Sequence, residues 1–121
     1  MRQVEFEQLV AEALDALPAE IQSYMENIVV TLADWPSRAE LESVGRGSPY
    51  ELLGLYQGVP LTQRGRAYNM TLPDRIVIYR GPIEALARHP DSIRYHIQRT
   101  VAHEIGHHFG ITDEELRALG Y

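Results

Sequence analysis

The chain has 121 residues and a formal net charge of −6, with 45% hydrophobic and 23% charged residues. This length fits one domain with one modest core, and the composition is that of an ordinary globular protein. The acidic charge excludes a nucleic-acid partner, because binding to phosphates requires a basic surface. The chain has no cysteines, so disulfides and thiolate metal sites are excluded and any metal must bind to His, Asp or Glu.

Neither a targeting segment nor a membrane span is evident in the sequence. The start, MRQVEFEQLV, alternates charged and apolar residues and lacks the apolar centre of a signal peptide. No apolar run is long enough to cross a bilayer. We therefore expect a single domain over residues 1–121 that is cytoplasmic and has no membrane partner.

The N-terminal part is predicted to hold helices and then a strand. An amphipathic helix is predicted up to Pro18, because apolar residues recur at helical spacing. These residues are Phe6, Leu9, Val10, Ala13, Leu14 and Leu17. A second, short helix is predicted over residues 18–25, and the β-branched run at 27–34 predicts a buried strand. Residues 36–50 are rich in turn formers and charges, which favours a loop with at most one helical turn.

The middle of the chain is predicted to supply two more strands. Residues 52–61 predict a strand with a glycine break, and residues 63–74 predict a loop. The segment at 75–80, RIVIYR, alternates and is rich in β-branched residues. It predicts a strand that places Ile76 and Ile78 on one face.

Helices are predicted for the C-terminal third. A short helix starts at Pro82, and a long helix covers about residues 91–109, opening at a cap-like Asp-Ser pair and closing at Gly110. Thr112 and Glu115 have the spacing of a capping box and predict a short C-terminal helix. The elements together predict a single domain with an α+β fold.

The long helix carries a pattern that is typical of a metal hydrolase. His103 and His107 are four residues apart, which places both imidazoles on one helix face, where they can bind one Zn²⁺. Glu104 follows the first histidine and is rotated by about 100° from it. From there its carboxylate can reach a metal-bound water without binding the metal, which is the place of a general base.

A catalytic zinc site needs a third protein ligand besides water. Gly110 lies where the helix must end and the chain reverse, and Asp113 follows three residues later. Asp113 is therefore the candidate third ligand, with Glu114 as the alternative. Asp113 also falls in the first turn of the C-terminal helix, where an acid is favourable without any metal.

Other polar residues near this pattern have less specific roles. His108 is next to a candidate ligand but lies on another helix face, which favours packing over metal binding. His96 is seven residues before His103 and shares nearly its face, so it is either a supporting group or a buried or rim histidine. Tyr79 and Tyr95 are open candidates for stabilising an oxyanion.

The segment HEIGHHFGITD resembles the extended motif of zincins, the His-Glu-x-x-His metallopeptidases, in the variant with aspartate as the third ligand. The segments HEIGHHFGITDEEL, PDRIVIYRGPIE and LLGLYQGVPL are also similar to the small bacterial zincin-like proteins called minimal zincins, over about residues 27–119. This resemblance implies a small mixed sheet of three to four strands packed on the active-site helix. It also implies that the strand near Ile76 to Tyr79 can pair with an extended peptide in the cleft.

The chain departs from the metzincin pattern at one point. Metzincins have a methionine-containing turn beyond the third ligand, whereas the methionines here, Met1, Met25 and Met70, all lie upstream. Tyr121 is the only large side chain at the very end of the chain. We therefore expect Tyr121 to pack beside the histidines, with its hydroxyl or the terminal carboxylate near the site.

The pattern as a whole predicts a metallopeptidase that carries one Zn²⁺ per chain and acts on a peptide or protein. We do not expect residues 1–121 to hold the second subdomain that forms the other cleft wall of larger peptidases, so the alternative is a non-catalytic binding or assembly module with a structural metal or none. Hydrolysis of a non-peptide amide would use the same site. An open cleft is also compatible with a homodimer.

Overall fold

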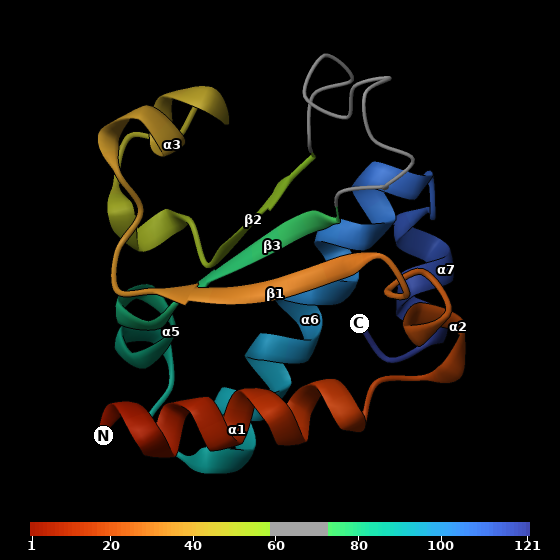
Figure 1. Ribbon diagram of the computed structural model, residues 1–121, viewed down its shortest axis with the longest axis horizontal. Coiled ribbons are helices and arrows are strands. Elements are labelled where there is room, and N and C mark those ends of the chain that lie inside the picture. Colours follow the sequence, from red (N-terminus) through yellow and green to blue (C-terminus); the bar gives the residue numbers. More distant parts are fainter. Residues whose placement is uncertain (59–72) are drawn as a thin grey trace, which may run out of the picture.

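The computed structural model describes residues 1–58 and 73–121 (Figure 1). Its elements follow one another as α1 (Gln3–Asp15), α2 (Ala19–Gln22), β1 (Ile28–Ala33), α3 (Arg38–Ser43), the 3-10 turn η1 (Pro49–Glu51), β2 (Gly54–Gln57), β3 (Asp74–Tyr79), α5 (Arg80–Leu86), α6 (Pro90–Phe109) and α7 (Asp113–Ala118). The α+β class, the N-terminal helix and the short C-terminal helix are confirmed. Within the described ranges, no helix combines the length and apolar character needed to cross a bilayer.

The strands form a mixed sheet in the order β1-β3-β2. β3 is the central strand, and it pairs in parallel with β1 and antiparallel with β2. Ile76 and Ile78 face the main core, as predicted, while Val77 and Tyr79 belong to a smaller apolar cluster. Because β1 and β2 take both edges of β3, the expectation that this strand pairs with a peptide is wrong.

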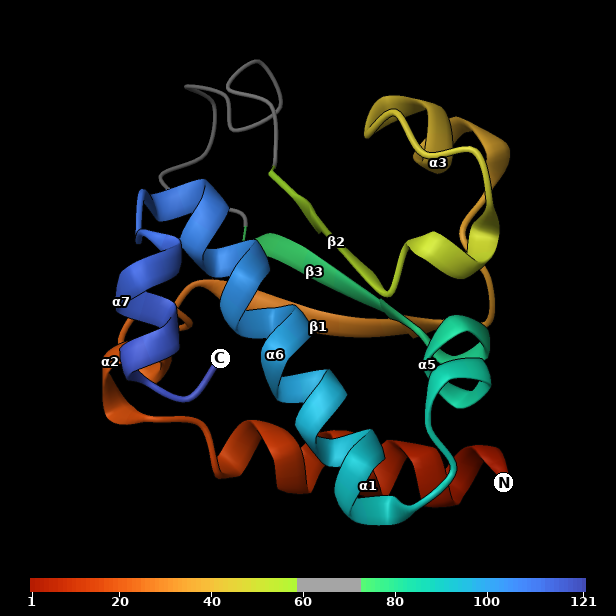
Figure 2. The ribbon, with the colours of Figure 1, turned by 180° about the vertical axis from the view of Figure 1, so that it is seen from behind.

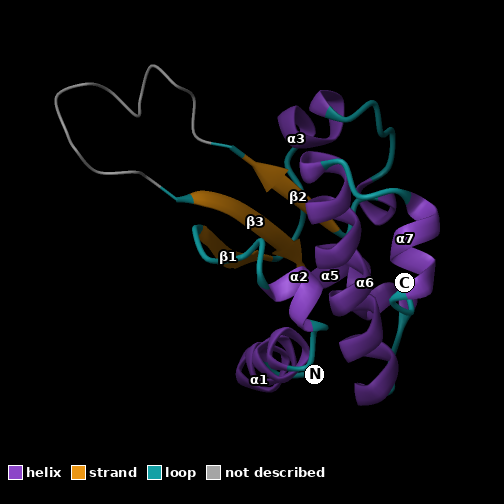
Figure 3. Cartoon of the chain, turned by 90° about the vertical axis from the view of Figure 1, so that its right-hand side faces the viewer, coloured by secondary structure: helices purple, strands orange, loops and turns teal. Residues whose placement is uncertain are grey.

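The main core lies between the sheet and the helices α1 and α6. Figure 2 shows α6 crossing one face of the sheet, and Figure 3 shows α6 and α7 on the same side of the strands. α6 buries six residues in this core: Ile93, Ile97, Val101, Ala102, Ile105 and Gly106. α1 packs on α6, and the Gln98 side chain of α6 donates to the main-chain oxygen of Ala13 at 3.0 Å. The helix that will carry the site is therefore fixed along most of its length.

Two local predictions differ from the structure in their details. The segment at 36–50 contains the helix α3, whose N-terminus has a capping box formed by Ser37 and Glu40. α6 begins at Pro90, and its N-cap is His89, whose Nδ1 accepts from the amide of Asp91 at 3.1 Å. The His89 imidazole therefore caps the helix, whereas the sequence had suggested Asp91 and Ser92 for this role.

The region between β2 and β3 is only partly comparable with the predictions. The predicted strand at 52–61 is observed as the shorter β2, and its last three residues lie outside the described part. Most of the predicted loop at 63–74, including Met70, also lies outside the described residues. Asp74, predicted as loop, is the first residue of β3.

Candidate metal centre

His103, Glu104 and His107 lie in the last two turns of α6. The helix ends at Phe109, and Gly110 adopts a left-handed conformation with φ of 79°. Glycine accepts this conformation without the Cβ strain of other residues. The Ile111 amide then donates to the Gly106 oxygen at 2.9 Å, so the chain reverses at the predicted glycine.

The reversal leads directly into α7, which positions Asp113. Thr112 is the N-cap of α7 and forms the predicted capping box with Glu115. Asp113 is the first residue of the helix, and Leu116, one turn later, is fully buried in the main core. Leu116, together with the partly buried Ile111 and Leu119, packs this segment against the main core.

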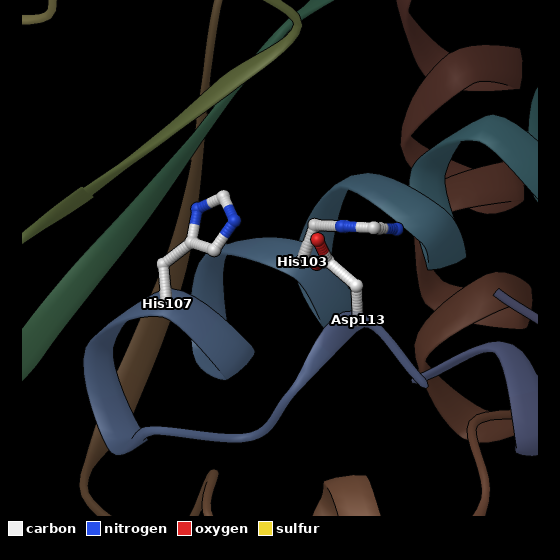
Figure 4. A group of neighbouring side chains, drawn as sticks. All are labelled: His103, His107 and Asp113. Carbon is white, nitrogen blue, oxygen red and sulfur yellow. The ribbon is translucent and has the colours of Figure 1, made fainter. Parts of the chain in front are cut away.

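His103, His107 and Asp113 form one group of possible metal ligands (Figure 4). Each offers a ligand atom, and these atoms lie within 4.8 Å of one another. Zinc bonds of about 2.0–2.1 Å in a tetrahedron put the ligand atoms roughly 3.4 Å apart. Small side-chain rotations would bring the three ligand atoms to this spacing. The donor set of two imidazoles and one carboxylate fits zinc, and Glu114 is not part of the group.

Glu104 extends from α6 toward the sheet. Its Oε1 accepts a hydrogen bond from the main-chain amide of Tyr56 in β2, at 2.8 Å. The side chain is half-buried and lies outside the ligand group. This bond ties Glu104, which follows His103 in α6, to a strand that the sequence did not connect with the site.

Tyr121 lies beside His103. Its main-chain oxygen is 3.1 Å from His103 Nε2, and its hydroxyl donates to Gln98 Oε1 at 3.2 Å. Burial raises the pKa of the Tyr121 hydroxyl above its usual value. In Figure 4 the His103 ring extends away from His107, so the last residue of the chain contacts the outer side of this imidazole.

His96 and His108 lie outside the ligand group. His96 is half-buried beside Tyr95, with the ring centroids 5.6 Å apart. Burial and the charge of Arg99 lower its pKa. His108 stacks on Tyr56 with centroids 3.9 Å apart, and the Tyr56 hydroxyl donates to Asp74 Oδ2 at 2.5 Å. The packing role expected for His108 agrees with this stack.

Tyr79 does not line an accessible site. Its side chain is fully buried in the smaller apolar cluster, and burial together with the neighbouring Glu40 raises its pKa. A buried phenol cannot contact a substrate, so the oxyanion role suggested for Tyr79 is wrong. Tyr95 is exposed and stacks loosely on Tyr121, with centroids 6.3 Å apart.

Two imidazoles and one carboxylate are a donor set that is found in mononuclear zinc sites. The family model described as zincin-like metallopeptidase matches residues 25–121, and the chain belongs to this family. The resemblance drawn from the sequence is therefore confirmed. A search of curated proteins gives no match.

Proposed function

We propose that the protein is a zinc-dependent peptidase in which His103, His107 and Asp113 hold one Zn²⁺ and Glu104 is the general base. The observation that carries this proposal is the gathering of three donor atoms within 4.8 Å, next to Glu104, in a chain of the metallopeptidase family. Membership of this family also implies zinc binding.

The proposed chemistry divides between the metal and the residues of the chain. When bound, zinc lowers the pKa of a water and polarises a carbonyl. The Glu104 carboxylate takes a proton from the attacking water while the new C–O bond forms. It then passes the proton to the leaving amine as the C–N bond breaks. The main-chain oxygen of Tyr121 orients the His103 ring, as outer partners of metal-bound histidines commonly do.

The sheet suggests where a peptide substrate would bind. Since β3 is paired on both sides, a peptide can add only at an outer strand of the sheet formed by the described residues. β2 is the outer strand next to the site, because its Tyr56 contacts Glu104. We therefore propose that an extended peptide lies beside β2 and above α6, without using the Tyr56 amide that Glu104 already binds, in place of the predicted pairing with β3.

A peptide library incubated with the zinc-loaded protein tests this function. We expect cleavage that stops with a chelator and returns when zinc is added back. Glu104→Gln should lower the cleavage rate by about 10²–10⁴-fold and leave zinc bound. Glu114→Gln is the control, since this glutamate lies outside the ligand group, and it should leave the rate unchanged.

The outcomes separate the candidate functions. Bound zinc without cleavage of any peptide would favour the non-catalytic module. Cleavage that survives both the chelator and Glu104→Gln would contradict the proposed roles of the metal and the base.

A further inference from the structure

The contact between Glu104 and Tyr56 joins two elements that are far apart in the sequence. The two residues are separated by 48 positions, yet the Tyr56 amide and Glu104 Oε1 are 2.8 Å apart in a partly buried place. A hydrogen bond to a carboxylate is shorter and stronger than one between neutral groups. It restrains one oxygen of the carboxylate.

The register of the sheet explains why this amide can reach Glu104. Residues that face each other in an antiparallel pair alternate between bonded and non-bonded positions. The Tyr79 amide donates to the oxygen of Leu53 at 2.9 Å, so Leu53 is at a bonded position. Tyr56, three residues later and opposite Ile76, is then at a non-bonded position. Its N–H points away from β3, and Glu104 binds it without taking a bond from the sheet.

A second contact sets the distance between β2 and α6. A Cβ atom on Gly54 would lie 2.6 Å from Thr100 Cγ2 and 3.0 Å from the Val77 oxygen, so the close approach requires glycine. Thr100 and Glu104 are about 6 Å apart along the helix axis. Gly54 and Tyr56 are roughly 6.7 Å apart along the strand. The two contacts are therefore in register, with Gly54 against Thr100 and Tyr56 against Glu104.

We propose that β2 is the positioning element of Glu104. The Tyr56 amide holds the carboxylate beside the ligand group, and Gly54 lets β2 come close enough to do so. The reason is geometric, because a general base must stay within hydrogen-bond reach of the proton it takes, and a glutamate without a partner samples many rotamers. This role rests on the proposed function, but the bond itself can be measured without any hydrolysis.

The first test measures the bond in solution by the NMR signal of the Tyr56 amide. We expect Glu104→Ala to move its proton upfield and to speed its exchange with solvent. Glu114→Ala is the matched control and should change neither quantity. An unchanged Tyr56 amide in the Glu104 variant would overturn the proposal whether or not the protein is a peptidase.

The second test measures the consequence for catalysis with single amide-to-ester replacements. The α-hydroxy analogue of tyrosine at position 56 removes the N–H that binds Glu104. We expect kcat to fall roughly 10- to 100-fold, the size of a misplaced catalytic group, with KM and zinc affinity unchanged. The α-hydroxy analogue of leucine at position 55 is the control, because Leu55, opposite Val77, is at a bonded position inside the sheet. It should lower stability and leave kcat unchanged, and an equal loss of kcat in both esters would refute the positioning role.

The third test uses the spacing between Gly54 and Thr100. Gly54→Ala should lower kcat because the new methyl group pushes α6 away from β2. Thr100→Ser removes the closest atom, Cγ2, and should restore much of the lost kcat when combined with Gly54→Ala. Thr100→Ser alone should behave as the native chain. If the double variant is no better than Gly54→Ala, Gly54 does not act through this contact.

If wild-type protein cleaves no peptide while the Tyr56 amide still responds to Glu104→Ala, the failure lies in the proposed function and not in the contact.

Discussion

The helices α3 and α7 have similar local structures, but only α7 lies at the candidate metal centre. α3 and α7 each have six residues, a capping box and one buried leucine. The leucines are Leu41 in α3 and Leu116 in α7. Only α7 carries a candidate metal ligand, Asp113, at its first position. The local construction is therefore not what makes a site, and the difference lies in what each helix packs against.

The surroundings of the two helices explain this difference. α7 follows the reversal at Gly110, which turns the chain back beside the end of α6 and its histidines. α3 is tied instead to β2, where Gln57 donates to Glu40 Oε2 at 3.2 Å. α3 has the same kind of cap and buried leucine as α7 but no candidate ligand. Substitutions in α3 are therefore controls for the matching substitutions in α7.

Loss of the ligand itself should have the largest effect on metal binding. Asp113→Ala removes one of three protein donors. Zinc affinity should therefore fall by more than the roughly 10- to 100-fold that is typical when a residue hydrogen-bonded to a metal ligand is lost. Zinc titration of the purified variants measures it. Glu114→Ala, one residue further along α7, should bind zinc as the native chain does. Equal losses in the two variants would mean that the charge of α7, and not a ligand, favours the metal.

Removal of the buried leucine should come next. Leu116→Ala and Leu41→Ala should each lower the free energy of unfolding by about 2–5 kcal/mol, with the larger loss at Leu116, which is fully buried. Only Leu116→Ala should also weaken zinc binding, because α7 then loses its fully buried contact with the core. Denaturant unfolding and zinc titration of both variants make the comparison. A similar weakening in Leu41→Ala would show that zinc affinity follows global stability alone.

The two capping boxes give a smaller effect of the same kind. Thr112→Ala and Ser37→Ala each remove the side chain that accepts from the third residue of its helix, at 3.1 Å in both cases. Each should cost about 1 kcal/mol of stability. Zinc affinity should fall in Thr112→Ala alone, since this cap sets the position of Asp113. If both variants keep the native affinity, the cap does not hold the ligand.

The smallest effect is expected at the end of the chain. Tyr121→Phe removes the bond to Gln98 and should lower stability by about 1 kcal/mol. Its main-chain oxygen still contacts His103, so zinc affinity should not change. Tyr95→Phe is the control on the same face, and it should have less effect on thermal unfolding because that ring is exposed. A loss of zinc in Tyr121→Phe would place the hydroxyl, and not the main chain, in the support of the site.

Local sequence patterns predicted much of the site. Helical spacing placed His103 and His107 on one face of α6, and the glycine signal and capping box placed the turn and the start of α7 correctly. The same Ser-x-x-Glu signal at residues 37–40 was interpreted as loop, because turn formers and charges surround it. Its one apolar anchor, Leu41, gives no periodic pattern that would mark a helix this short.

Contacts between distant segments could not be predicted from such patterns. The hydrogen bond from Tyr56 to Glu104 depends on the strand order and on which edge of β2 faces away from β3. No local sequence pattern predicts either of these properties. The sequence predicted a glycine break within residues 52–61, but it did not show that Gly54 lies against Thr100 of α6. The pairing expected for β3 was wrong for the same reason, since strand order is a property of the whole fold.

Zinc content after loading and desalting tests the central claim most directly. The native chain should retain one zinc ion per chain, and His107→Ala, which leaves the core of α6 intact, should retain none. His108→Ala, one residue further along the helix, should retain one ion because His108 packs on Tyr56 and lies outside the ligand group. A native chain that retains no zinc, or a His107→Ala variant that retains as much as the native chain, would contradict the proposed ligand set.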